Sequence, residues 1–330
     1  MLIRPRRNRV SSGMRTLVRE TLLTPGNLVL PLFIQEGEDK ADPIPAMPGC
    51  SRLTLDRAVL LAREAQALGI PAVALFPVIE ERLKDASASE ALNAEGLVPR
   101  ALRRLKREVP GLMVITDVAL DPYSSDGHDG LVREGRIDND ASLPVLSRMA
   151  VIQARAGADV VAPSDMMDGR IQAIREGLDR EGFSGVGLCS YCAKYASAFY
   201  GPFRAALDSA PRHRPGVPED KRSYQMDPAN VREALREAAL DEAEGADWLM
   251  VKPGLPYLDV IAALHRASSL PIAAYHVSGE YSMLRAAAER GWLDYDASLL
   301  ESLTALRRAG ASIIFTYGAL DAARLLRVGH

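Results

Sequence analysis

Short apolar segments alternate with longer amphipathic segments along nearly the whole chain. The apolar segments are bounded by Gly, Pro, Asp or Ser, which is typical of β-strands. Because most of them are continuous apolar runs, they predict strands that are covered on both faces, as in a parallel sheet. Eight such segments can be distinguished: LVLPLFI from Leu28, IPAVALF from Ile70, LMVITDV from Leu112, ADVVAP from Ala158, GVGLCSY from Gly185, ADWLMVK from Ala246, PIAAYHV from Pro271 and SIIFTY from Ser312.

The segments between these strands predict helices. In LDRAVLLAREAQALG and VREALREAALDEAEGAD, apolar residues return every three or four positions. Gly69, Gly182 and Gly245 follow such segments, where glycine supplies the left-handed helix cap. Eight strand–helix units predict an α/β fold of the (β/α)8 TIM barrel type, with residues 28–330 as one domain. The alternative is an open doubly wound sheet, but no glycine-rich dinucleotide fingerprint follows the first strand.

Residues 1–27 precede the first strand and predict an N-terminal extended arm. The first nine residues contain four arginines, and no acidic residue appears before Glu20. This composition superficially resembles a transit peptide, but a short exposed arm is the simpler interpretation.

Composition excludes several classes of protein. The chain has 40 Lys and Arg against 43 Asp and Glu, a formal net charge of −3, which argues against a general nucleic-acid partner. The apolar runs are far shorter than the roughly 20 residues that cross a bilayer, so we expect no membrane segment. Three cysteines without a secretory leader point to a reducing compartment, and we expect a cytoplasmic location.

Polar side chains stand at the carboxyl ends of six predicted strands. In a barrel of this type, these ends form the mouth where active sites lie. The residues are Asp117, Ser164, Lys194, Lys252, Ser278 and Tyr317.

The two lysines carry the chemical prediction. Lys252 ends the apolar run WLMVK, and desolvation there lowers the pKa of an amine. A neutral amine attacks carbonyl carbons, and Lys194 nearby would depress the pKa of Lys252 further, as in Schiff-base enzymes. The alternative is that each lysine is a strand-end charge that reaches solvent. Two lysines at equivalent positions favour the catalytic interpretation.

A long irregular segment at about residues 195–225 lies between the two lysines and predicts an active-site lid. Its Arg204, Lys221 and Arg222 are suited to an anionic substrate, although a solvated basic loop remains the alternative.

The segment DVALDPYSSDGHDG, from Asp117 to Gly130, concentrates four aspartates and one histidine. Oxygen-rich clusters favour magnesium, but a solvated turn explains the composition equally well. The role of His128 stays open. The CSYC spacing of Cys189 and Cys192 lacks a second pair to complete a zinc site, which favours barrel packing.

Five segments of the chain are highly specific when taken together: VAPSDMMDGR at Val161, SYCAKYASAFYGPFR at Ser190, SYQMDPAN at Ser223, LMVKPGLPYLD at Leu249 and YHVSGEY at Tyr275. With them, the chain resembles the porphobilinogen synthase, or 5-aminolevulinate dehydratase, family over essentially its whole length. The resemblance implies that two molecules of 5-aminolevulinate condense with loss of two waters, and it implies no organic cofactor.

The resemblance also implies roles for the candidate residues. Lys252 and Lys194 match the lysines that bind the substrates supplying the propionate and acetate sides of the product. Asp117 and Ser164 match polar residues that line the site, where proton transfer and amine positioning are needed. The matches to carboxylate-binding residues are Ser278 and Tyr317 for the first substrate, and Arg204 and Lys221, with Gln225 nearby, for the second.

The expectations about metals follow from positions at which this chain differs from the zinc-dependent branch of the family. Ala119, Asp121 and Asp129 occupy positions that carry cysteines in the zinc-dependent branch, so no zinc is expected. The chain resembles the branch that magnesium stimulates at an allosteric site. Glu237 matches the ligand of that site, and Asp168 matches a carboxylate near its water shell. Whether Asp121 or Asp129 also binds an active-site cation stays open.

The arm resembles the family's N-terminal extension, which implies a homo-oligomer, with an octamer expected. Two rival functions remain from the residues alone: a Schiff-base aldolase on the same barrel, and a non-catalytic scaffold. The aldolase needs only one lysine, and a scaffold has no use for two lysines and two carboxylate-binding groups around one mouth.

Overall fold

Eight parallel strands close into a barrel in the computed structural model, which describes residues 1–212 and 214–328. Each strand pairs with the next, and the last returns to the first through the register Leu28 to Ile314. The (β/α)8 prediction is therefore confirmed. In barrel order, the strands are β1 (Leu28–Ile34), β4 (Ala72–Pro77), β5 (Met113–Val118), β8 (Val160–Pro163), β9 (Gly187–Lys194), β10 (Trp248–Lys252), β11 (Ile272–His276) and β12 (Ile313–Thr316).

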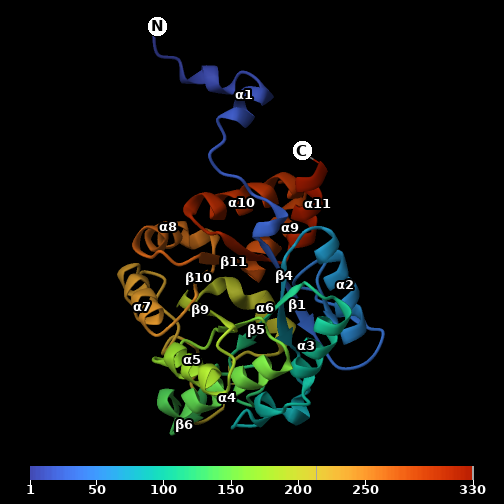
Figure 1. Cartoon of the computed structure of the whole chain (residues 1–330), viewed down its shortest axis with the longest axis vertical. Helices are drawn as coiled ribbons and strands as arrows, with labels where there is room; N and C mark the ends of the chain where they lie inside the picture. The colour runs from blue at the N-terminus through green and yellow to red at the C-terminus, as the bar shows by residue number, and fades with distance from the viewer. Residues whose placement is uncertain (213, 329–330) are drawn as a thin grey trace.

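Helices surround this barrel on all sides (Figure 1). The connection from β11 to β12 carries two helices, and a short helix, α6 (Gly201–Leu207), lies in the segment after β9. The covering helices are α2 (Leu55–Ala67), α3 (Leu97–Glu108), α4 (Asn139–Ala156), α5 (Arg170–Arg180), α7 (Arg232–Ala243), α8 (Leu258–Ala267), α9 (Ser278–Glu289), α10 (Tyr295–Ala309) and α11 (Ala319–Val328).

Two short strand pairs decorate the barrel. β3 (Ser51–Leu53) continues the sheet beside β1, and β2 (Ala41–Pro43) pairs with it in the antiparallel direction. A hairpin of β6 (Leu131–Arg133) and β7 (Arg136–Asp138) precedes α4.

Aspartates fix the starts of two neighbouring pairs of strands. Asp159 accepts a 2.7 Å hydrogen bond from the backbone N–H of Val114, and Asp247 accepts a 2.8 Å bond from that of Leu188. Both aspartates follow a Gly-Ala pair at the end of a helix. The repeated Gly-Ala-Asp motif thus ends a helix and sets the register of the next strand.

Strand boundaries differ from the sequence expectation at one important place. The fifth barrel strand was expected from Gly185 to Tyr191, with Lys194 beyond it, but β9 continues to Lys194. Pairing with β10 holds the extra residues in the strand, since Lys194 lies opposite Lys252 in the register. The two lysines therefore end adjacent strands.

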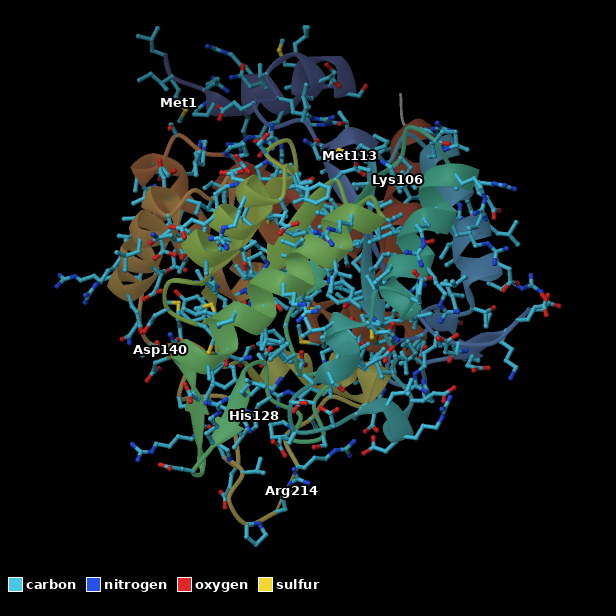
Figure 2. The ribbon with its side chains drawn as sticks, turned by 60° about the horizontal axis from the view of Figure 1, so that its bottom comes forward. Met1, Lys106, Met113, His128, Asp140 and Arg214 are labelled. Carbon is cyan, nitrogen blue, oxygen red and sulfur yellow. The ribbon has the colours of Figure 1, made fainter. Side chains whose placement is uncertain are left out.

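The N-terminal arm leaves the barrel as a separate projection (Figure 1). Every residue from 1 to 20 is exposed in the single chain. The arm is partly helical, with a 3-10 turn at Pro5–Arg9 and α1 at Ser12–Leu17. Figure 2 shows Met1 on the same side as Met113, which begins β5, and His128 on the opposite side. The arm thus leaves from the amino ends of the strands.

No helix among the described residues is long and apolar enough to cross a membrane. Within the predicted segments, His213 of the lid and residues 329–330 of the barrel domain lie outside the described residues.

Candidate active site

The predicted polar residues converge on a pocket at the carboxyl ends of the strands. Its remaining volume is only about 20 Å³, room for about one water molecule. Substrate entry therefore requires part of the wall to move. The pocket is lined by Asp117, Asp121, Asp129, Ser164, Lys194, Tyr200, Phe203, Arg204, Ser209, Lys221, Gln225 and Lys252.

Lys252 lies among aromatic rings. Burial, and after it the nearby ammonium of Lys194, lower the pKa of its amine from 10.5 to about 7. Among the described residues, no hydrogen bond or ion pair to its Nζ is present. At pH 7, roughly half of this lysine is therefore present as the neutral amine, which is the form that attacks a carbonyl carbon. The ring centroids lie 4.6 to 5.5 Å from Nζ and belong to Tyr191, Tyr200, Phe203 and Tyr275.

Lys194 has the opposite environment. Its Nζ donates to Asp129 Oδ1 at 3.0 Å and to the carbonyl oxygen of Ser164 at 2.5 Å. Asp129 also binds Lys221 Nζ, at 2.8 Å from Oδ2. Burial alone raises the pKa of Asp129, but the two ammonium groups outweigh it and hold this pKa below its usual range. One strand end thus presents an unpaired amine and its neighbour a paired ammonium.

The carboxyl group of Asp117 is influenced by both lysines. Burial raises the pKa of its carboxyl to about 6, and the two lysines oppose that rise. Its Oδ1 is buried without a hydrogen-bond partner. An acid with a pKa near the working pH, and with a free oxygen facing the pocket, is suited to general acid–base catalysis.

The lid segment supplies the other wall of the pocket. Arg204 and Gln225 line it, and the Oε1 atom of Gln225 is buried without a partner. Lys221 Nζ binds Asp121 Oδ2 at 3.2 Å in addition to Asp129. The three residues expected to hold the second substrate's carboxylate therefore line the same pocket.

Ser278 and Tyr317 lie at the same mouth but do not line the pocket. Ser278 Oγ accepts a 3.0 Å hydrogen bond from the backbone N–H of Phe203. Tyr317 Oη pairs with Tyr275 Oη at 3.0 Å, and the Tyr317 ring stacks on Phe33. The Phe203 ring packs against Phe33 and lies over Lys252, so it contacts both the lysine pocket and the Ser278 and Tyr317 region.

His128, whose role the sequence leaves open, fastens the lid. Its ring nitrogens contact Tyr224 Oη at 3.0 Å and the carbonyl oxygen of Pro218 at 2.9 Å. Tyr224 Oη in turn donates to Asp129 Oδ2 at 2.7 Å. Figure 2 shows His128 and Arg214 on the same side of the molecule, where Arg214 forms an ion pair with Asp126.

Sequence reasoning missed the aromatic residues around Lys252 and a buried ion pair behind the site. Tyr191 and Tyr275 point into the barrel from β9 and β11. Because side chains alternate between the two faces of a strand, their positions in the sequence could have indicated this. Arg170 is fully buried and binds Asp241 through two 3.1 Å hydrogen bonds, and it also donates to Ser190 Oγ. No local pattern predicts this pair, because its partners are 71 residues apart.

The predicted magnesium residues lie in a separate pocket of about 480 Å³, also lined by Arg136 and Tyr224. Asp168 and Glu237 line it together with Glu233. Burial raises the pKa of Glu237, and nearby carboxylates add to the rise. No group of three or more His, Cys, Asp or Glu is arranged to hold a metal directly in the described part of the chain. The three carboxylates that line this pocket nevertheless suit a cation that keeps most of its bound water molecules, such as magnesium.

Asp121 and Asp129 are the other candidate metal ligands. Both face Lys221, and Asp129 also faces Lys194. The ammonium groups thus neutralise the same oxygens that a cation would need.

Comparisons with known proteins agree with this geometry. The family model "Delta-aminolevulinic acid dehydratase" matches residues 2–325. The chloroplastic delta-aminolevulinic acid dehydratase of Oryza sativa is 59% identical, over 98% of this chain and 75% of that protein. The dehydratase of Bradyrhizobium diazoefficiens is 52% identical, over 99% of this chain and 92% of that protein.

A solved structure extends the similarity to three dimensions. The delta-aminolevulinic acid dehydratase of Toxoplasma gondii, in complex with the reaction product porphobilinogen, superposes with a TM-score of 0.95. It is 52% identical, and the match covers 98% of this chain and 91% of that one. The chain therefore belongs to the delta-aminolevulinic acid dehydratase family, and it is a lyase of the hydro-lyase class.

Proposed function

We propose that Lys252 and Lys194 each form an imine with one molecule of 5-aminolevulinate in the reaction of this family, which makes porphobilinogen. The observation that carries the proposal is the pair of lysines at the ends of adjacent strands, opposite each other in the register. An imine draws electrons from the neighbouring carbon and so acidifies it for carbon–carbon bond formation. Holding both substrates in one pocket also replaces a bimolecular encounter with an oriented one.

The other polar residues at the mouth of the barrel bind the two substrates and move protons. Arg204, Lys221 and Gln225 hold the carboxylate of the substrate on Lys194, and Ser278 and Tyr317 hold that of the substrate on Lys252. Asp117 accepts and returns protons, supported by its raised pKa and its unpartnered oxygen. Ser164 places the carbonyl oxygen beside Lys194 that orients the amine. Two 5-aminolevulinate molecules lose two waters and give one porphobilinogen.

Colorimetric detection of porphobilinogen tests this assignment. Purified chain incubated with 5-aminolevulinate should give the pyrrole, whereas folded Lys252→Ala protein should give none, because no other group reaches the same carbonyl. Lys40→Ala, at an exposed position, is the matched control and should behave as the parent chain. Near-normal product from Lys252→Ala would overturn the role of this lysine, and no pyrrole from the parent chain would reopen the aldolase and scaffold alternatives.

We further propose that the chain needs no zinc and responds to magnesium near Glu237 and Asp168. Ala119 offers no ligand atom, and the ammonium groups beside Asp121 and Asp129 argue against a cation in the active site. Activity that survives chelation and rises with added magnesium supports this branch. Activity that only zinc restores would contradict it. In Glu237→Gln protein, added magnesium should no longer raise the activity above the rate measured without magnesium.

We also propose that the exposed arm joins subunits in a homo-oligomer, with an octamer expected. Eight solvent-exposed apolar side chains in the arm and at its root are left without partners in the single chain, which supports a subunit contact: Met1, Leu2, Ile3, Val10, Met14, Leu17, Val18 and Leu22. Sedimentation of the full chain and of a form lacking residues 1–20 tests this, since a monomeric full chain would refute it. The cytoplasm remains the proposed location.

A further inference from the structure

The lid helix α6 lies directly over Lys252 and fills the mouth of the barrel. Phe203 projects from it between Phe33 and Phe76, with ring centroids 5.7 and 5.4 Å apart, and its own ring is 4.9 Å from Lys252 Nζ. Ala206 and Leu207 are buried in the same apolar cluster. Because the pocket beneath retains only about 20 Å³, this helix must move to admit a substrate and must return to exclude water.

Two cations from the barrel hold the carboxyl end of this helix. Arg52, on β3, donates through Nε to the carbonyl oxygen of Ala206 at 2.7 Å and through Nη2 to that of Ala205 at 2.8 Å. Lys84 Nζ donates to the carbonyl oxygen of Asp208 at 3.0 Å. These carbonyls lack partners within the helix, and the helix dipole makes this end negative.

The surroundings of Lys84 show that it is committed to this contact. Its side chain is only 1% exposed, although it carries a charge. The carboxylates of Glu81 and Asp208 lie 3.4 and 3.7 Å from its Nζ, and Arg212 binds the same two carboxylates at 3.1 Å. Burying an ammonium is costly unless its donors are used, so the lysine stabilises the closed position of the helix end.

We propose that Arg52 and Lys84 are positioning residues that cap the lid helix α6 and hold it closed over Lys252. Arg52 lies on β3 opposite Phe33 of β1, and Lys84 lies in the loop that follows β4. Neither lines the pocket. They act through the backbone of α6, which places Phe203 over the lysine.

The cap has a consequence for catalysis, and this consequence rests on the proposed role of Lys252. When the cap is removed, α6 spends more time open, and water reaches the amine and the imine. We expect slower product formation without any loss of a group that touches substrate. Since hydrogen bonds from charged groups are stronger than neutral ones, losing the cap should change the opening equilibrium by at least about tenfold.

Limited proteolysis of the full-length protein measures opening directly. In Arg52→Met, Lys84→Met and the double variant, trypsin cleavage after Arg204, within α6, should accelerate at least about tenfold. Cleavage after Arg266, which is exposed at the end of α8 and lies outside the arm, serves as the internal reference and should not change. The matched controls are Arg57→Met and Arg82→Met, which remove exposed ion pairs in the same region, 43% and 75% exposed, and should leave α6 unaffected.

Steady-state kinetics and rescue separate positioning from general destabilisation. The Met variants should lose kcat about tenfold at an unchanged thermal unfolding temperature, and Arg52→Lys, which keeps the charge but not the two-pronged contact, should recover part of it. If the double variant fails to fold, the single variants Arg52→Lys and Lys84→Arg carry the same comparison. Unchanged cleavage after Arg204, or unchanged kcat despite faster cleavage, overturns the proposal.

The two readouts also separate this proposal from the function it rests on. If the parent chain made no porphobilinogen, the proposed function would fail, whereas the cleavage comparison would still decide whether Arg52 and Lys84 hold the lid helix.

Discussion

The lowered pKa of Lys252 leads to a quantitative prediction for imine formation. With a pKa of about 7, roughly half of the amine is neutral at pH 7, whereas an ordinary lysine with a pKa of 10.5 has about one neutral amine in 3,000. Imine formation requires the neutral amine, so its rate should rise with pH through about 7 and level off above about pH 8. An unperturbed lysine would still be gaining rate near pH 10.

Borohydride trapping measures this rate at the residue itself. The protein is mixed with 5-aminolevulinate at a series of pH values and reduced after short intervals, and the modified peptide is identified by mass spectrometry. Modification of the Lys252 peptide should follow a single ionisation near pH 7, and Lys252→Ala protein should lack it. A midpoint near pH 10 would refute the reasoning, because it would show that the aromatic surroundings do not desolvate the amine in solution.

Three further substitutions test the buried ionic contacts in and around the pocket. Each is measured by thermal unfolding or kinetics at fixed protein concentration. Asp129→Asn leaves the buried ammonium of Lys194 without a carboxylate partner and removes one of the two carboxylates on Lys221, so it should lower the unfolding free energy by about 3 to 5 kcal/mol. Since the pKa of Asp129 is lowered, its contribution is present above the ordinary carboxyl pKa of 3.8 and is lost as pH falls below it. Arg170→Met should cost a similar amount, and a second change, Asp241→Leu, should restore much of it; no recovery would contradict the pairing. Glu280→Ala removes the acceptor of three backbone N–H groups beside the Lys252 loop and should slow product formation about tenfold, while unchanged kcat would count against this role.

The sequence predicts the barrel and the positions of the two lysines because both depend on local patterns. A strand of the parallel sheet is a continuous apolar run, and a polar residue at its carboxyl end marks the mouth. Lys252 and Tyr317 therefore appear at their strand ends from the sequence alone. For Lys194, the sequence predicts a strand that ends a few residues too early, because pairing with β10 extends β9 beyond its apolar segment.

The contacts that set the chemistry were not predictable in the same way. Whether a lysine is paired depends on side chains that arrive from distant segments: Asp129 reaches Lys194 across 65 residues, and aromatic rings surround Lys252 Nζ, to which no hydrogen bond or ion pair forms among the described residues. The caps on α6 likewise join residues 124 and 154 positions apart. Sequence periodicity reports which face of an element is buried, but it carries no information about such partners.

The environment that makes Lys252 reactive also lowers the stability of the folded chain. Because its pKa in the folded state lies below the unfolded value of 10.5, the lysine favours folding fully only above that value, and this contribution is lost as pH falls towards 7. At pH 7, the difference corresponds to roughly 4 kcal/mol, a large part of a typical folding free energy. Lys252→Met should therefore be inactive yet unfold at a temperature a few degrees higher, and its advantage should shrink as the pH approaches 10. A barrel with a large apolar core tolerates this cost, so the stability lost at the amine of Lys252 is supplied by residues outside the pocket.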